Sequence, residues 1–127
     1  MKLLSTMAFH PVIPILRIFD EARAREFYLD FLGFQIEFEH RFAPDLPLYM
    51  GIVRDTCRIH LSEHSGDGSP GVTVRIECDE VDDYQRALVA KQSKYCRPGI
   101  SDTDWGMREM RVKDAFGNTL VFYRRMG

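Results

Sequence analysis

The first half of the chain changes from strand-like to helix-like spacing of its apolar residues. Residues 11–18 are rich in Val, Ile and Leu, which predicts a first strand. Asp20 can cap the start of a helix, and Gly33 tolerates the left-handed backbone at a helix end. Between these two residues, apolar side chains recur at helical spacing at Ala24, Phe27, Tyr28 and Phe31. The pattern therefore predicts a helix between Asp20 and Gly33.

Three more strands are expected before the middle of the chain. Phe34, Ile36 and Phe38 alternate with polar residues, so they should share one half-buried face of a strand. Residues 48–53 and 56–62 are two further strand-like runs, separated by a polar dipeptide. They predict a hairpin that ends the first half.

The second half repeats the order of the first. A stretch containing Gly, Ser and Pro at residues 63–70 predicts a linker. Residues 71–78 then alternate like a strand, and Asp79 can cap the helix that follows. The remaining predicted elements are a helix through Val81, Tyr84 and Leu88, a loop at residues 97–99, strands at 107–113 and 119–124, and a turn at 114–118.

This repetition of strand, helix and further strands predicts an internal duplication. We expect an α+β fold in which two β-α-β-β-β modules, at about residues 10–64 and 71–125, build a single domain over residues 1–127. Each helix would cover the outer face of a curved, mostly antiparallel sheet, and the opposite faces would curl into a cup.

Composition narrows the range of partners. The formal net charge is −2 with no Lys- and Arg-rich cluster, so neither nucleic acid nor an anionic membrane is expected as a partner. The opening run MKLLSTMAF is too short for a signal peptide or a membrane span. The three cysteines, an odd number without a CxxC pair, suit a reducing compartment. We therefore expect a cytoplasmic protein.

Ordered motifs run through nearly the whole chain. The strand at residues 12–18 is followed by Asp20, by Arg25-Glu-Phe-Tyr28 and by Leu32-Gly-Phe34. The second half contains Ile76-Glu-Cys-Asp-Glu-Val-Asp82, Trp105-Gly-Met-Arg-Glu109 and Asp114-Ala-Phe-Gly-Asn118. In this order the motifs resemble the glyoxalase/bleomycin-resistance/dioxygenase superfamily (the vicinal oxygen chelate superfamily), and its bleomycin-resistance branch in particular. Ala115 departs from the Pro that is usual in the family's turn.

The resemblance implies four positions at which metal-using members carry His or Glu. These correspond to Ile13, His60, Thr73 and Val121. Of the four, only His60 binds a divalent ion well, whereas a minimal catalytic site needs three protein ligands. We therefore expect neither a metal nor another cofactor. His60 can be a hydrogen-bonded histidine of the cup or a direct contact to a ligand.

Alternation along the strands predicts which side chains line the cup. They include Arg58, His60 and Ser62 in the first half and Glu109 and Arg111 in the second. This mixture of polar and charged groups is typical of a binding pocket, although charges paired at a dimer seam would give the same pattern. Four aromatic residues complete the candidate ligand-binding set: Phe38, Phe42, Tyr49 and Trp105.

Flat aromatic surfaces stack on planar or cationic ligands, although Trp105 can equally cover the core. The resemblance therefore implies a homodimeric, metal-free protein, without catalytic residues, that sequesters an antibiotic of the bleomycin type by stoichiometric binding. Four carboxylates would attract a cationic drug: Glu37, Glu39, Glu77 and Glu109.

Two other functions stay open. One is a metal-dependent lyase or dioxygenase of the same superfamily. The other is a module that binds an unrelated metabolite, because one fold hosts many functions.

Overall fold

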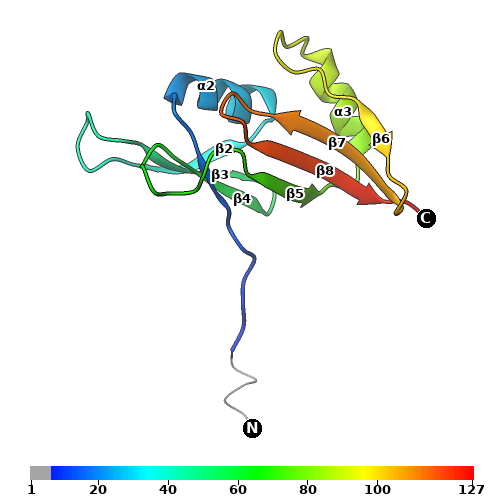
Figure 1. Cartoon of the computed structure of the whole chain (residues 1–127), viewed down its shortest axis with the longest axis horizontal. Helices are drawn as coiled ribbons and strands as arrows, with labels where there is room; N and C mark the ends of the chain where they lie inside the picture. Colours follow the sequence, from blue (N-terminus) through cyan, green and yellow to red (C-terminus); the bar gives the residue numbers. More distant parts are fainter. Residues whose placement is uncertain (1–6) are drawn as a thin grey trace.

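Two four-stranded sheets lie side by side in the computed structural model, which describes residues 7–127 (Figure 1). Their strand orders are β1-β4-β3-β2 and β5-β8-β7-β6. β1 pairs with β4 in parallel, and β5 pairs with β8 in parallel. All other neighbouring strands are antiparallel. The strands are β1 (Ile15–Arg17), β2 (Gln35–His40), β3 (Tyr49–Arg54), β4 (Cys57–Ser62), β5 (Thr73–Glu77), β6 (Ile100–Asp102), β7 (Met107–Lys113) and β8 (Thr119–Arg125). The predicted α+β fold of two repeated modules is confirmed.

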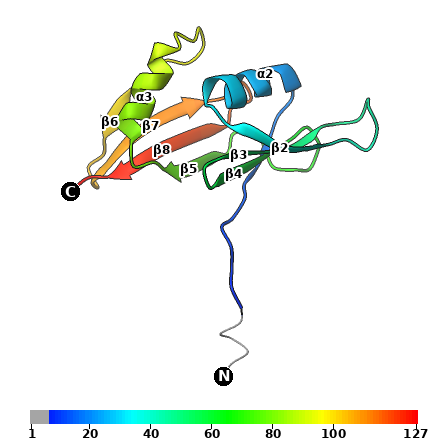
Figure 2. The same cartoon turned by 180° about the vertical axis from the view of Figure 1, so that it is seen from behind.

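The helices lie on one side of both sheets, and residues 7–14 leave on the other side (Figures 1 and 2). α2 (Glu21–Arg25) continues directly into the π-helix η1 (Glu26–Phe31), and α3 (Val81–Ala90) follows β5. None of the helices within residues 7–127 combines the length and the apolar character needed to cross a bilayer. The prediction for the opening run MKLLSTMAF falls partly on residues 1–6, which lie outside the described residues.

The first helix begins as predicted but changes its winding. The Asp20 side chain accepts a hydrogen bond from the backbone N–H of Arg23 at 3.0 Å, as an N-cap does. After α2 the wider turn of η1 lets the Leu32 N–H reach the carbonyl of Phe27 at 2.9 Å. Gly33 then adopts φ +86°, the left-handed conformation expected of it.

Several of the observed elements differ from the predicted ones. The first strand covers only β1 rather than residues 11–18, because Pro11 and Pro14 cannot donate to a ladder. Glu80 rather than Asp79 precedes α3, and its side chain makes no cap hydrogen bond. The short strand β6 lies in a stretch whose Gly, Pro and Asp content predicts a loop.

A bulge in β2 overturns the predicted face of Phe38. The pairing of β2 with β3 shifts between Ile36 and Phe38, so the alternation of side chains slips by one residue. Glu37 and Phe38 consequently both contact side chains of the face away from the helices, whereas Phe34 is buried in the core. The expectation that Phe34, Ile36 and Phe38 share one face is wrong for Phe38.

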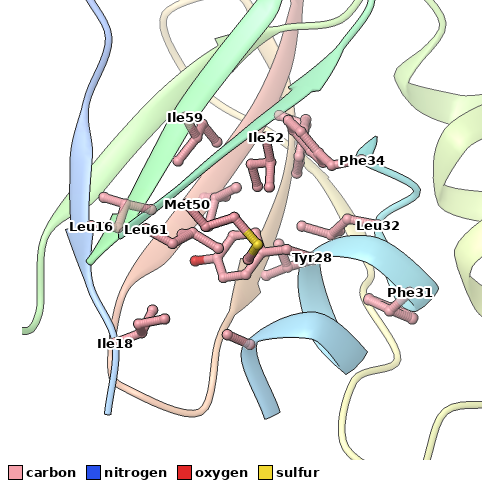
Figure 3. Packing of buried hydrophobic residues seen from close by; sticks show 14 of the residues in the cluster. Leu16, Ile18, Tyr28, Phe31, Leu32, Phe34, Met50, Ile52, Ile59 and Leu61 are labelled. Atoms are coloured by element: carbon pink, nitrogen blue, oxygen red, sulfur yellow. The ribbon is translucent and has the colours of Figure 1, made fainter. Parts of the chain in front are cut away.

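The core fills the space between the sheets and the helices. In Figure 3 the ring of Tyr28 points from the helical segment toward Met50, Leu16 and Leu61 of the first sheet. All four side chains are fully buried. Other residues of the same cluster come from the helices and from both sheets: Ala24, Leu32, Ile52, Ile59, Val81, Leu88, Met110, Val112, Leu120 and Phe122. Leu16, Ile59 and Leu61 face the helices, as the alternation predicts.

One buried polar network joins the two halves. The Tyr28 hydroxyl donates to Asp114 Oδ2 at 2.7 Å, and the Asn118 amide donates to the same oxygen at 2.9 Å. Asp114 Oδ1 accepts from the backbone N–H groups of Phe116 and Asn118. The Asn118 amide also donates to the carbonyl of Arg17 at 2.9 Å. A single carboxylate therefore shapes the β7–β8 turn and fastens it to the first helical segment.

The predicted linker packs against the sheet. Asp67 Oδ2 accepts a hydrogen bond from the Ser62 hydroxyl at 2.9 Å. At Gly68, which has φ +71°, an added Cβ would lie 2.7 Å from the carbonyl oxygen of Ile15. The glycine is needed there because the loop passes so close to β1.

The Tyr28 hydroxyl offers a test of the network. In Tyr28→Phe, Asp114 loses one of the four donors around its carboxylate while the apolar packing remains. We expect the free energy of unfolding to fall by about 1.5–3 kcal/mol, the range for buried hydrogen bonds to charged groups. Urea titration would measure it, with exposed Tyr95→Phe as the matched control. Equal stability of the two variants would contradict the role assigned to Asp114.

Candidate functional site

Three aromatic side chains gather on the face of the first sheet that the helices leave open. The rings of Phe38 and Tyr49 are stacked, with centroids 6.2 Å apart and planes 15° apart. The His60 imidazole meets both rings edge-on, at 5.1 Å from Phe38 and 5.3 Å from Tyr49. We call these three residues the aromatic cluster.

Gly51 makes the aromatic cluster possible. It lies between Phe38 and His60 in the strand register, and the Phe38 ring lies across the place where a side chain would be. A Cβ on Gly51 would be 2.2 Å from Phe38 Cε1, far inside van der Waals contact. The bulge brings Phe38 to this face, and the glycine lets its ring reach across β3 to His60.

Tyr49 determines how His60 presents its ring. The Tyr49 hydroxyl lies 2.8 Å from His60 Nδ1. Burial, aided by the negative charge of Asp67, raises the pKa of Tyr49, so its hydroxyl stays protonated and can donate. When Nδ1 accepts this hydrogen bond, neutral His60 carries its proton on Nε2. Nε2 makes no hydrogen bond within residues 7–127, which leaves an N–H donor for a ligand.

Paired charges occupy the same face of the second sheet. Arg75 donates to Glu109 at 2.9 Å and lies over the Tyr123 ring, 4.5 Å from its centroid. Arg111 is 4.0 Å from the other oxygen of Glu109, which is only 4% exposed. In the register, Val121 lies between Arg75 and Arg111 and is fully buried. The second sheet thus presents one buried carboxylate with two arginines and a tyrosine ring.

A cavity of about 410 Å³ lies where the two sheets meet. Its walls are residues 10–14, residues 56–59 around β4 and residues 74–76 of β5. Arg58 and Arg75 both line it, one from each sheet. Arg58 is held by Glu37 at 3.0 Å, so it enters the cavity wall as part of an ion pair. Phe38, Tyr49 and His60 do not line this cavity, so its walls offer apolar side chains and two guanidinium groups.

The structure brings together some of the predicted residues and not others. Phe38, Tyr49 and His60 form the aromatic cluster, while Arg58, Glu109 and Arg111 lie on the same open side of the sheets. Phe42 is exposed in the loop after β2 and packs edge-on against His40, with centroids 4.8 Å apart. Ser62 is fully buried, and its hydroxyl accepts from the His64 N–H while donating to Asp67. Trp105 is 69% exposed in the connection between β6 and β7.

Two residues of the open face, Arg75 and Tyr123, are absent from the predicted binding set. Strand alternation places both in the cup, because they lie two residues from Thr73 and Val121. Neither has a sequence motif that distinguishes it from a solvent-facing residue. Only the pairing of β5 with β8 brings Arg75 over the Tyr123 ring and within hydrogen-bond distance of Glu109.

The side chains present do not fit the metal that metal-using members of the family carry. His60 is paired with Ile15 and Gly51, so the register sets Ile15 rather than Ile13 beside it. On the second sheet Val121 lies beside Arg75 rather than Thr73. Across residues 7–127, no three His, Cys, Asp or Glu side chains are grouped closely enough to hold an ion. No chemical step can be assigned to a metal at this face.

Substituting Gly51 tests the construction of the aromatic cluster. In Gly51→Ala the Phe38 ring must leave its place over β3, and we expect a loss of about 1–3 kcal/mol from overpacking. The His60 ring protons should shift in NMR spectra as the Phe38 ring current moves away. Gly99→Ala is the matched control, since a Cβ there meets open space. Unchanged His60 resonances in Gly51→Ala would contradict the arrangement.

Comparisons with known proteins agree with this architecture. The bleomycin-binding protein from bleomycin-producing Streptomyces verticillus, solved with copper(II)-bleomycin, is 24% identical with a TM-score of 0.67, covering 96% of this chain and 99% of its own. Another bleomycin-binding protein, complexed with bleomycin, is 18% identical with a TM-score of 0.69, covering 92% of this chain and 99% of its own. TioX from Micromonospora sp. ML1 is 16% identical with a TM-score of 0.68, covering 91% of this chain and 100% of its own.

These structural likenesses are below 25% identity, so they establish the shared fold and not a shared ligand. Among curated proteins, none matches the sequence. The family described as "Glyoxalase superfamily protein" matches residues 1–127. The chain, with its two repeated sheet-and-helix modules, is a member of the glyoxalase superfamily.

Proposed function

We propose that this protein is a metal-free, homodimeric binding protein of the cytoplasm that sequesters bleomycin or a similar antibiotic. Binding is stoichiometric: the bound drug is kept from its target, and no bond is broken. The observation that carries the proposal is the aromatic cluster of Phe38, Tyr49 and His60, which stands beside a charged face on the open side of the sheets.

The geometry favours a ligand with flat heteroaromatic rings. Phe38 and Tyr49 are nearly parallel, so a planar ring can extend their stack, and such a contact contributes about 0.5–1.5 kcal/mol beyond burial. His60 Nε2–H can donate to an acceptor atom of the same ligand. Bleomycin-type glycopeptides carry both flat heteroaromatic rings and many hydrogen-bonding groups.

The glutamates expected to attract a cationic drug contribute less to its binding than their number implies, because arginines already pair with them. Glu37 pairs with Arg58 and Glu109 with Arg75, while Glu39 pairs with Arg25 on the helix side. A cationic ligand must compete with those guanidinium groups for the same oxygens. Aromatic stacking, rather than attraction to free carboxylates, is therefore the main source of affinity in this proposal.

The two bleomycin-bound structures support the choice of ligand to test first. They share this fold over more than nine-tenths of the chain, covering 92% and 96% of it. Their ligand is a property of those proteins, and its transfer to this chain is the part of the proposal that needs measurement.

The segment before β1 supports the homodimer. Residues 7–14 run away from the sheets in both views (Figures 1 and 2), and Phe9 and Val12 are 98% and 88% exposed. Two large apolar side chains in an extended segment are costly to leave in water. A second copy of the chain would cover them, and its own segment would be covered in return, as two-fold symmetry requires.

Titration with bleomycin tests the ligand. We expect calorimetry with metal-free and copper-loaded bleomycin to give one ligand per chain, and Phe38→Ala to weaken binding roughly two- to tenfold. Val89→Ala, an exposed apolar residue on α3, is the matched control. Trp105→Ala and Phe42→Ala show whether the site extends to their loops. No heat with either form of bleomycin up to high micromolar concentrations would remove this ligand.

The homodimer has its own test. Light scattering should give twice the mass of one chain, and the double variant Phe9→Ser, Val12→Ser should give the mass of one chain with an unchanged circular dichroism spectrum. A variant that remains dimeric would contradict a role for residues 7–14 in association.

A further inference from the structure

A second cavity, of about 450 Å³, lies on the helix-bearing side of the molecule. It is formed between the α2–η1 segment, the loop after α3 and the turn that follows β7. Figures 1 and 2 show this loop and the first helical segment above the sheets, while residues 7–14 leave below them. The cavity therefore shares no wall with the aromatic cluster.

Aromatic side chains make its floor. Phe27 and Phe31 come from η1, with ring centroids 5.8 Å apart and planes 34° apart. Residues four apart come close to alignment in a π-helix, which sets both rings toward the same side. The half-buried thiol of Cys96 completes the floor from the facing loop. Burial raises the pKa of the Cys96 thiol, so it behaves here as an apolar group.

The rim carries an unusual set of unpaired groups. Arg23 and Glu26 stand on the helical side and make no ion pair with any residue from 7 to 127. Tyr95 stands on the loop opposite them and is 85% exposed. Its exposed ring lines the cavity from a different element than Phe27 and Phe31, and it provides a second flat surface for a ligand.

The two sides of the cavity are tied together without a ligand. Lys91, which follows α3, donates to the carbonyl oxygens of Asp30 at 2.8 Å and Phe31 at 2.5 Å. Asp114 lines the back of the cavity, but both of its oxygens are used by the network with Tyr28. The cavity therefore has a wall in place before any ligand binds, and both Asp114 oxygens already accept hydrogen bonds within the protein.

We propose that this cavity is a second small-molecule site, and that its ligand is a flat aromatic carboxylate. The ring lies between the Phe27–Phe31 floor and the Tyr95 ring, where it is removed from water on both faces. The carboxylate pairs with the Arg23 guanidinium, whose planar fork matches two carboxylate oxygens. This site is independent of the antibiotic-binding proposal, because it uses none of the same residues.

Cys96 reports on occupancy of the cavity. With 1-naphthoate as the probe, we expect saturable protection of Cys96 from iodoacetamide, followed by mass spectrometry of the labelled peptides at about pH 8.5, near the usual thiol pKa. Cys57 and Cys78 do not line this cavity, so their labelling rates serve as internal controls and should not change. Naphthalene-1-methylamine, which has the same ring and the opposite charge, should protect much less.

Charge variants separate the proposal from simple apolar binding. Arg23→Gln should weaken naphthoate binding roughly three- to fivefold, as expected for a partly exposed ion pair, whereas Glu26→Gln should strengthen it. Arg86→Gln, on the exposed surface of α3, is the matched control. Equal protection by the two probes, an unchanged affinity in Arg23→Gln, or no protection of Cys96 at millimolar naphthoate would each overturn the proposal.

Discussion

The hydrogen bonds of Asp114 are the constraint on which the arrangement of the two halves depends. The carboxylate accepts two backbone N–H groups of its own turn and side-chain donors from Tyr28 and Asn118. Burial and the adjacent Asp114 charge raise the pKa of Tyr28 far above its usual range, so Tyr28 remains a donor at any physiological pH. Since a buried carboxylate without these donors would cost several kcal/mol, the turn and the first helical segment must stay together. Tyr84 of the second half adds another link, because its hydroxyl donates to the carbonyl of Leu32, which also accepts from Arg54.

The two sides of the sheets carry different kinds of side chain. Leu16, Leu61, Met110 and Leu120 face the helices and form the shared core. The face away from the helices carries polar and aromatic groups such as His60 and the Arg75–Glu109 pair. Glu109 is buried, but its charge is matched by a guanidinium at 2.9 Å. The buried carboxylate of the open face is thus already paired before any ligand binds.

Much of the fold could be predicted from the sequence, because alternation and helical spacing report burial directly. The order of the elements, the Asp20 cap and the position of Gly33 follow from such local signals. The bulge at Ile36–Phe38 could not be predicted, because a strand with a bulge has the same kind of composition as a regular strand. The extra residue nevertheless turns every later side chain to the opposite face of the sheet. The winding of η1 is hidden for a similar reason, since apolar residues four apart suit both α- and π-helices. Alternation along β4 placed Ser62 in the cup, and nothing in that local pattern shows that Asp67 of the following loop accepts its hydrogen bond.

The candidate site shows the same limit in chemical terms. The sequence shows that Phe38 and Tyr49 are aromatic but not that their rings meet. The Phe38 ring can lie across β3 only because Gly51 has no side chain there. His60 shows the consequence for function. At a position where metal-using relatives would place a ligand, its Nδ1 faces the Tyr49 hydroxyl, and its neighbours in the sheet are Ile15 and Gly51. An imidazole held in this way can offer one N–H donor, and a single imidazole is too little for a coordination sphere. Because the shared core lies on the helix-bearing side, the side chains of the open face can change while the packing that holds the fold is kept.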